Sequence, residues 1–283
     1  MPASATRHPQ HTRALLMLLL ANLCWGLSFP TIKAAALVQT ALLPGSGNWF
    51  ITAMLLAPRF LLATALLLLW QGRALGRTTR GELRQGLELA LFAAAGMVFQ
   101  TDGLQFTEAS TSAFLTQLYA ILIPAWLALR LRRHPGLRIW LCGGLVLAGV
   151  AILGHLDWRA LTLGRGEVET LVCSVFFMGQ ILCLDRPEFA GNDPLRVTFV
   201  TFAVQTVLYA ALLAGTAPDL AAVLAPLTSP AWLGLMAALG TICTLGAYIL
   251  MNTWQPRITA TEAGLIYCFE PIFGSLFALA LPA

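Results

Sequence analysis

The sequence predicts an all-α polytopic membrane protein, and three observations lead to this prediction. Of the 283 residues, 58% are hydrophobic and 11% are charged, whereas a soluble domain usually carries about 25% charged residues. The apolar residues form continuous runs of about twenty, the length of helix needed to cross the hydrocarbon core of a bilayer. Arginines gather in alternate connections between these runs. No connection is long enough to hold a soluble domain.

Nine apolar runs predict nine transmembrane helices joined by short connections, which often contain Pro or Gly. Their approximate spans are 14–36, 49–70, 85–105, 110–129, 138–154, 167–184, 196–215, 230–251 and 258–281. The first run resembles the apolar part of a secretory signal, but no small-residue cleavage site follows it. We therefore expect an uncleaved first helix after an N-terminal tail at residues 1–13.

The placement of arginines predicts the orientation of the chain. The arginines that flank alternate connections are Arg7, Arg13, Arg73, Arg77, Arg80, Arg84, Arg130, Arg132, Arg133, Arg138, Arg186, Arg196 and Arg257. The connections on the opposite face carry only Arg159 and Arg165. The positive-inside rule therefore predicts a cytoplasmic N-terminus, in the cytoplasmic (inner) membrane of a bacterium. The basic runs are not interleaved with aromatic residues, so we expect the lipid bilayer, and no nucleic acid, as a partner.

A weak internal repeat appears when the chain is shifted by about 150 residues. Residues 109–119 then lie over residues 260–270, and residues 58–63 lie roughly over residues 204–209, in the same order. Because a unit of five helices is odd, its second copy enters the membrane upside down. Inverted repeats are typical of transporters that hold a substrate near the midplane of the membrane. The predicted halves are residues 14–154, with five helices, and residues 167–283, with four.

Three charged residues within the apolar runs are candidates for gating. Arg59 and Glu270 are expected near the centre of the bilayer, where a charge costs ~2.5–3.5 kcal/mol unless it faces protein or water. Arg59 is either an anion-contacting or gating residue or a structural charge. Glu270 is a proton-coupling carboxylate, a partner of Arg59 or a protonated structural acid. Lys33, near the outer end of the first helix, either reaches back to the interface or lines the outer mouth.

Neutral polar and aromatic side chains at depth predict a substrate pathway. We select Trp25, Gln100, Gln117, Tyr119, Tyr248 and Tyr267. Further polar residues at depth are Asn22, Ser28, Gln180, Gln205 and Asn252. Glu88, Asp102 and Glu108 are expected at the interface. A path lined by amides and rings suits an amphipathic metabolite better than a bare ion, although each polar group singly also serves as a bond between helices. The small-residue pairs Gly144/Ala148, Gly234/Ala238 and Gly274/Ala278 are assigned to helix packing.

The sequence predicts no cofactor and no metal site. All six cysteines lie within apolar runs, without a paired motif or a histidine at ligand spacing. No phosphate-binding loop is present, which excludes ATP hydrolysis by this chain as a driving force. The chain also has none of the metal or nucleophile motifs that an enzyme acting on lipid inside the membrane would need.

Several motifs together resemble a known family. They are residues 24–33 (CWGLSFPTIK), 59–63 (RFLLA), 103–110 with 113–116, the glycine-spaced helix at 143–154, and 270–274 (EPIFG). Taken together over the whole chain, they resemble EamA-type members of the drug/metabolite transporter superfamily. The resemblance implies a fold of ten helices in two inverted repeats. It also implies a Glu-Pro pair shared by members with different substrates, which favours a structural or gating role for Glu270 over substrate choice.

Two departures from the family pattern stand out. Leu129-Arg130 and the basic Arg132-Arg133 replace a Gly-Glu that usually closes the fourth helix. The chain also ends at Ala283, where the ninth helix ends, so a truncated reading frame is expected, with a genuine nine-helix protein as the alternative.

The resemblance implies a secondary transporter, not an enzyme. We expect it to export small organic metabolites such as amino acids or drugs by alternating access, with protons as a coupling ion and a homo-oligomer as a further expectation. The alternatives are a membrane scaffold or sensor that does not transport and, less favoured, an intramembrane enzyme that modifies lipid.

Overall fold

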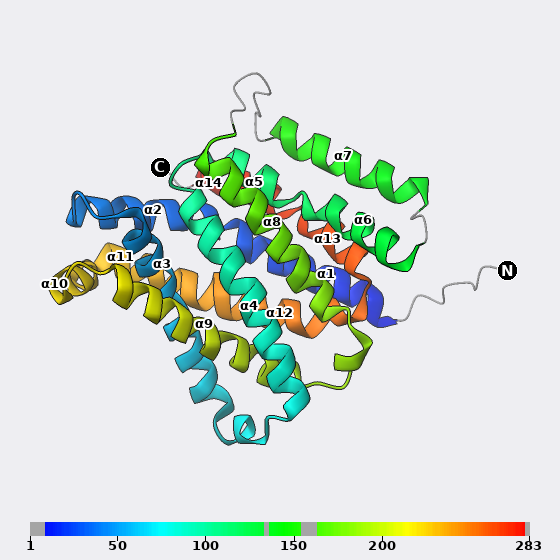
Figure 1. Ribbon diagram of the computed structural model, residues 1–283, viewed down its shortest axis with the longest axis horizontal. Helices are drawn as coiled ribbons and strands as arrows, with labels where there is room; N and C mark the ends of the chain where they lie inside the picture. The colour runs from blue at the N-terminus through cyan, green and yellow to red at the C-terminus, as the bar shows by residue number, and fades with distance from the viewer. Residues whose placement is uncertain (1–8, 133–135, 154–162, 281–283) are drawn as a thin grey trace.

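The computed structural model describes residues 9–132, 136–153 and 163–280, and helices joined by turns make up this part of the chain (Figure 1). Six helical stretches within it are long and apolar enough to span a membrane. They are Gln10–Leu42, Asn48–Arg77, Thr111–Arg130, Arg165–Leu184, Pro194–Thr216 and Pro230–Arg257. The prediction of an all-α polytopic membrane protein is thereby confirmed.

The helices of the described residues follow the predicted spans. They are α1 (Pro9–Gly26), α2 (Ser28–Leu42), α3 (Asn48–Gln71), α4 (Arg80–Gly103), α5 (Ala109–Thr116), α6 (Tyr119–Leu131), α7 (Leu137–Leu153), α8 (Arg165–Leu184), α9 (Pro194–Thr216), α10 (Leu220–Leu224), α11 (Pro230–Ala238), α12 (Ala247–Trp254), α13 (Ala260–Tyr267) and α14 (Glu270–Ala280). A π-helical segment, η4 (Leu239–Gly246), joins α11 to α12. Short 3₁₀ turns, η1 (Gly72–Arg77), η2 (Pro187–Phe189), η3 (Ala225–Thr228) and η5 (Gln255–Arg257), lie in the connections.

The N-terminal helix begins earlier than predicted. Helix α1 starts at Pro9, so residues 9–13 of the predicted tail are helical. Proline is accepted in the first turn of a helix because its missing N–H would have no partner there. The rest of the tail, residues 1–8, and the predicted span ends at 154 and 281 lie outside the described residues.

Three of the predicted helices are each interrupted near the middle, and proline accounts for two of the interruptions. Pro30 has no N–H to donate to the carbonyl of Gly26, and the helix breaks at Leu27, between α1 and α2. Pro271, in the first turn of α14, similarly follows the break at residues 268–269 between α13 and α14. Each break leaves backbone groups that the helical ladder does not use.

The third interruption lies between α5 and α6, at residues 117–118, and no proline adjoins it. At this interruption the N–H of Ala120 donates to the carbonyl of Gln117, three residues earlier, at 2.9 Å. This is the hydrogen bond of a 3₁₀ turn, not that of an α-helix. This break and the break between α13 and α14 fall at matching positions when residues 109–119 are laid over 260–270. The weak repeat in sequence therefore coincides with a repeat in backbone geometry.

Helix packing follows a pattern expected of two related halves. Helix α4 packs against α8, and α1 packs against α12; these two pairs are equivalent if the halves are exchanged (Figure 1). Likewise α3 packs against η4, and its equivalent α9 packs against α4. The central pair, α3 with α9, is its own equivalent. These pairings agree with the predicted division at residues 14–154 and 167–283, which stays a prediction.

A glycine allows a close approach between α1 and α14. A Cβ atom on Gly26 would lie 2.6 Å from the Cβ of Phe273 and 2.8 Å from the backbone nitrogen of Gly274. Of the three small-residue pairs assigned to packing, only the one containing Gly274 lies at such a contact. Among the described residues no atom lies within 4 Å of a Cβ added at Gly144 or Gly234. The packing role predicted for those two glycines is therefore wrong, because they lie on open faces of α7 and α11.

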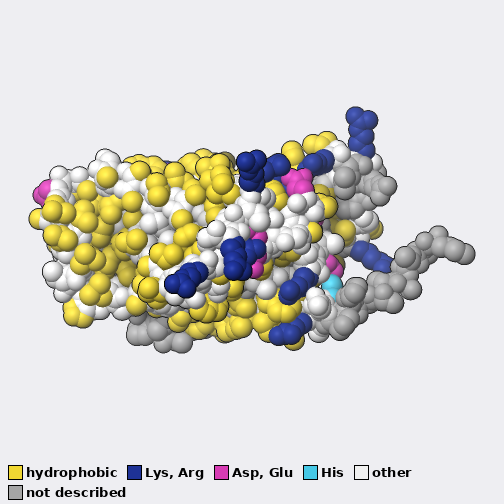
Figure 2. All heavy atoms as spheres, turned by 90° about the horizontal axis from the view of Figure 1, so that it is seen from below, with side chains coloured by type: hydrophobic (Ala, Val, Ile, Leu, Met, Phe, Trp, Pro, Cys, Tyr) yellow, Lys and Arg dark blue, Asp and Glu magenta, His cyan; other side chains and the backbone are white. Residues whose placement is uncertain are grey.

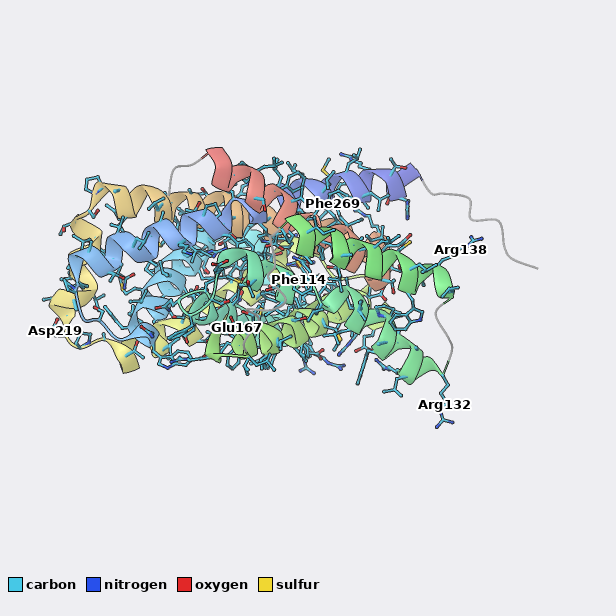
Figure 3. All side chains as sticks on the ribbon, turned by 90° about the horizontal axis from the view of Figure 1, so that it is seen from above. Phe114, Arg132, Arg138, Glu167, Asp219 and Phe269 are labelled. Atoms are coloured by element: carbon cyan, nitrogen blue, oxygen red, sulfur yellow. The ribbon has the colours of Figure 1, made fainter. Side chains whose placement is uncertain are left out.

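Arginine-rich connections gather toward one end of the molecule. Figure 3 shows Arg132 and Arg138 at one end and Asp219 at the other. In the space-filling view from below, Lys and Arg side chains lie over the middle and right of the face, while hydrophobic side chains cover much of its left part (Figure 2). At the arginine-rich end, Glu82 at the start of α4 forms an ion pair with Arg196 at the start of α9, at 2.6 Å.

The carboxylate of Glu82 is almost fully buried, and several donors converge on it. Arg196 donates to both of its oxygens, from Nε at 2.9 Å and from Nη2 at 2.6 Å. The backbone N–H groups of Thr79 and Asp193 donate as well, at 2.7 and 3.0 Å. These donors, Arg196 foremost, lower the pKa of Glu82 from 4.5 to about 2. A carboxylate with a lowered pKa stabilises the fold above its ordinary pKa and loses that contribution as the pH falls toward its folded value.

We expect Glu82→Gln to lower the free energy of unfolding by about 2 kcal/mol at neutral pH, because charge-assisted hydrogen bonds are lost. The difference from the wild type should shrink as the pH falls below 4.5 and vanish near 2. Thermal unfolding of the purified protein at neutral and acid pH measures both values. Glu108→Gln is the control, since Glu108 is exposed. A difference that persists unchanged in acid would contradict the assignment.

Candidate functional site

A cavity of about 50 Å³ lies where the three interrupted helices meet α3, α4, α8 and α12. It is lined by Trp25, Ser28, Arg59, Met97, Gln100, Tyr119, Phe177, Gln180, Ile181, Tyr248, Met251, Tyr267 and Glu270. One water molecule needs ~10–15 Å³ of such a cavity, so this cavity has room for several water molecules. Interrupted helices around a buried site are a recurring feature of membrane transporters, because their free backbone groups contact the substrate or the coupling ion.

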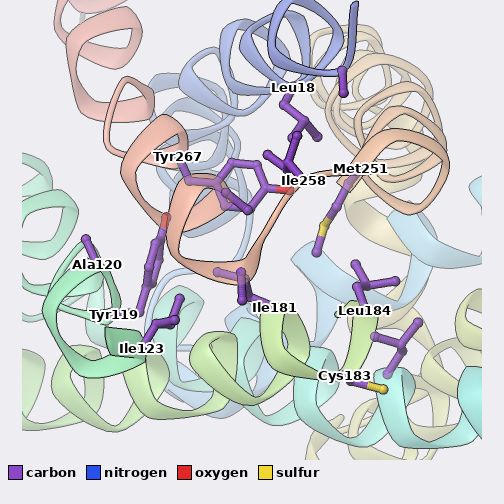
Figure 4. Close-up of a cluster of buried hydrophobic side chains, with 14 of the residues drawn as sticks. Leu18, Tyr119, Ala120, Ile123, Ile181, Cys183, Leu184, Met251, Ile258 and Tyr267 are labelled. Carbon is purple, nitrogen blue, oxygen red and sulfur yellow. The ribbon is translucent and has the colours of Figure 1, made fainter. Parts of the chain in front are cut away.

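Aromatic rings form one wall of the cavity. The ring of Trp25 lies edge to face between Tyr248 and Tyr267, with centroid distances of 5.9 and 5.5 Å. Figure 4 shows the rings of Tyr119 and Tyr267 on neighbouring helices, with Ile181 close to them. Such a wall offers apolar surface to a ligand and also the ring faces that attract cations.

Arg59 is held at the π-helical segment of the eighth predicted span. Its side chain is only 2% exposed, its Nε donates to the hydroxyl of Thr244, and its Nη2 donates to the carbonyl of Cys243 at 3.5 Å. The wider turns of a π-helix leave backbone groups in unusual positions, often at functional sites. The third nitrogen, Nη1, is buried without a hydrogen-bond partner. One part of the guanidinium is therefore clamped and another is unpaired beside the cavity.

Glu270 lines the same cavity from the first turn of α14. Gln117, in the break between α5 and α6, lies next to it. The amide of Gln117 is fully buried, and neither its nitrogen nor its oxygen has a hydrogen-bond partner of good geometry. Within the described residues Glu270 and Arg59 do not form an ion pair, although both line the cavity. A guanidinium and a carboxyl group therefore face one space from different helices.

The structure brings most of the predicted site residues together. Those that line the cavity are Trp25, Gln100, Tyr119, Tyr248, Tyr267, Arg59 and Glu270. Gln117 adjoins Glu270, whereas Lys33 is exposed on α2 and does not line the cavity. The role of each residue in transport stays a prediction.

Sequence reasoning missed the apolar part of the lining. Met97, Phe177, Ile181 and Met251 line the cavity, but apolar residues in apolar helices carry no signal that distinguishes them. Within the described part of the chain no group of three or more His, Cys, Asp or Glu side chains is placed to hold a metal ion.

A second polar network lies at the end of α4, on the side away from the arginine-rich connections. Asp102, expected at the interface, is instead completely buried. It accepts hydrogen bonds from Thr52 at 3.0 Å and from Nη2 of Arg165 at 2.5 Å. Arg165 also donates to Glu169 at 2.8 Å, and its guanidinium lies 4.2 Å from the ring centroid of Phe106. We call Thr52, Asp102, Arg165 and Glu169 the outer network, because they lie at the end away from the arginine-rich connections. The outer network joins α3, α4 and α8.

Comparison with known proteins agrees with this architecture. A protein of Archaeoglobus fulgidus described as an uncharacterized transporter is 23% identical over 274 residues, which span 95% of this chain and 78% of that protein. A solved crystal structure aligns with a TM-score of 0.65 and 18% identity, over 95% of this chain and 88% of that chain. At that identity the likeness shows the fold alone. Residues 12–154, half of the chain, match the EamA-like transporter family, and the chain belongs to this family of membrane transporters.

Proposed function

We propose that this protein is a secondary transporter that exports small organic metabolites, such as amino acids or drugs, by alternating access. The cavity at the three interrupted helices is the observation that carries the proposal. It combines an aromatic wall with an unpaired guanidinium nitrogen at Arg59 and the carboxyl group of Glu270. Amphipathic metabolites with charged ends match this combination of surfaces. Protons are the proposed coupling ion, with Glu270 as the group that binds them.

Two polar networks are suited to act as gates on opposite sides of the cavity. The outer network joins α4 to α8 through Asp102 and Arg165. At the other end, Glu82 joins α4 to α9 through Arg196, and His11 of α1 pairs with Glu262 of α13 at 3.2 Å. In alternating access, one set of contacts breaks while the other holds. Helix α4 takes part in both sets, so we propose that its tilt decides which side of the cavity opens.

The arginine-rich end is proposed to face the cytoplasm of a bacterial cell, with the N-terminus on that side. Cysteines introduced at Arg77, in the connection before α4, and at Leu220, at the opposite end beside Asp219 (Figure 3), test this orientation. In intact cells a charged thiol reagent should label Leu220→Cys and leave Arg77→Cys unlabelled. Labelling of Arg77→Cys in intact cells would reverse the proposed orientation.

A thermal-shift screen of the purified protein against pooled metabolites tests the binding function. We expect at least one pool to raise the melting temperature, because a ligand that binds only the folded state stabilises it. The shift should be lost in Glu270→Gln, which replaces the titratable carboxyl group in the cavity at nearly constant volume. Glu108→Gln, a change at an exposed carboxylate, should keep it. A ligand shift that survives unchanged in Glu270→Gln would contradict the assignment of the cavity.

A further inference from the structure

A row of hydroxyl groups lies between the outer network and the central cavity, at the contact of α5 with α8. Ser112 of α5 lies 3.3 Å from Thr170 of α8, oxygen to oxygen. Five residues before Ser112 and three before Thr170, Thr107 donates to Glu167 at 2.5 Å. Residue numbers therefore increase in the same direction along both segments, so α5 and α8 are parallel. Side chains four residues further along a helix lie on the same face.

One turn deeper, the same two faces therefore carry Thr116 on α5 and Ser174 on α8. All four hydroxyl residues of the row are at most 1% exposed. The oxygens of Thr116 and Ser174 are buried without a hydrogen-bond partner of good geometry, and the thiol of Cys173 lies beside Thr116. Unpaired polar groups are costly inside a membrane protein, and water is the usual partner of buried groups that other side chains do not reach.

Each end of the row meets a carboxyl group. At the outer end, Glu169 precedes Thr170, and its side chain is 12% exposed. One of its oxygens accepts from Arg165, and the other is buried without a hydrogen-bond partner of good geometry, beside the carboxyl group of Asp102. At the inner end, Gln117 follows Thr116 and lies next to the carboxyl group of Glu270, although its amide atoms have no hydrogen-bond partner of good geometry. Polar groups of α5 and α8 thus lie between Glu169 and the cavity, with Ser112 and Thr170 in contact and Thr116 and Ser174 one turn deeper.

We propose that these hydroxyl groups, with water between them, form a proton path from the outer network to Glu270. The inference rests on the proposed function and adds the route by which the coupling proton reaches the cavity. Each oxygen along the row accepts one proton on a lone pair and passes its own proton to the next. In sum, bulk water beyond Glu169 loses one proton, and the carboxylate of Glu270 becomes a carboxylic acid. No electrons are transferred.

The charged and titratable groups around both ends set the conditions for this transfer. Those around Glu270 are Arg59 of α3, Tyr119 of α6, Cys173 of α8, Cys243 of η4, Tyr248 of α12, and Tyr267 and Cys268 beside α13. Those around Glu169 are Asp102 and Arg165. Arg59 is the cation among the groups around Glu270, and the two side chains do not form an ion pair within the described residues.

Accessibility to Ag⁺, which is close to water in size and reacts with thiols, tests whether the row is hydrated. Single cysteines are placed at Ser174 and at Val175 in a background without the six native cysteines. Ser174 belongs to the row, whereas Val175 is on the next face of α8 and is 51% exposed. Ag⁺ added from the side of Arg165 should protect Ser174→Cys from later labelling in detergent, but not Val175→Cys. No protection at Ser174→Cys, or equal protection at both positions, would overturn the proposal.

Proton transfer itself is measured by infrared spectroscopy after a rapid drop in pH, on protein in lipid vesicles. The carboxylic-acid band that disappears in Glu270→Gln reports the protonation of Glu270. In the double variant Thr116→Val with Ser174→Ala, this band should appear at least about tenfold more slowly, because two relaying oxygens are lost. Its final height should be unchanged. Thr241→Val, which removes an exposed hydroxyl, should match the wild type.

An unchanged rate in the double variant would overturn the proton path. A lower final height of the carboxylic-acid band with an unchanged rate would also overturn it. That result would show that the two substitutions change the surroundings of Glu270 and do not slow proton transfer to it. Neither result depends on substrate, so the thermal shift by a metabolite remains a separate measure of the proposed binding function.

Discussion

Arg59→Gln is expected to weaken the binding of an anionic or zwitterionic metabolite about 10- to 100-fold, because hydrogen bonds to a charged group contribute ~1.5–3 kcal/mol. The Nη1 group of Arg59 is buried beside the cavity without a partner. A ligand carboxylate is the group that this nitrogen would pair with. Glutamine retains the means to hydrogen-bond Thr244, so the variant should fold. The dependence of the melting temperature on ligand concentration gives the affinity of each variant.

Lys33→Gln provides the matched control for this prediction. It also removes one positive charge from an apolar helix, but Lys33 is exposed on α2 and does not line the cavity. Its effect on ligand affinity should be less than about twofold, since an exposed charge is screened. Equal losses of affinity in the two variants would show that Arg59 acts only through the overall charge of the protein.

Gly26→Ala is expected to lower the free energy of unfolding by about 1–3 kcal/mol, through overpacking. The added methyl group would meet the backbone nitrogen of Gly274 at 2.8 Å, and backbone cannot move aside as a side-chain end does. Helices α1 and α14 must then separate, next to the breaks that border the cavity. Thermal or denaturant unfolding of the purified protein measures the change.

Gly144→Ala is the control for the glycine prediction. A methyl group at Gly144 meets no atom within 4 Å among the described residues. Alanine favours a helix over glycine by about 1 kcal/mol, so this variant should be as stable as the wild type or more stable. If Gly26→Ala were as stable as Gly144→Ala, the close contact of α1 with α14 would be refuted.

Much of the fold could be predicted from the sequence, because an apolar run that crosses lipid must form a helix of about twenty residues. Each predicted span contains helix within the described residues, and Pro30 and Pro271 mark two of the three interruptions. The break at residues 117–118 has no such marker. It becomes visible only through its match with residues 268–269 in the other half of the chain.

The candidate site was predictable where a polar residue stood out against apolar neighbours. Arg59, Glu270 and Gln100 are such residues, and all three line the cavity. Contacts that depend on distant parts of the chain were not predictable. Asp102 looks like an interfacial acid until Arg165, 63 residues later, is placed against it. Glycines posed the same difficulty, since Gly144 and Gly274 have similar neighbours in sequence but different surroundings in space.

Flux of a ligand found by thermal shift into vesicles that contain the purified protein is the most direct measure of the central claim. We predict saturable uptake of the labelled ligand by the wild type and by Glu108→Gln, and its loss in Glu270→Gln and Arg59→Gln. Equal uptake by empty vesicles, or unchanged uptake in both cavity variants, would show that the cavity of the three interrupted helices is not the transport site.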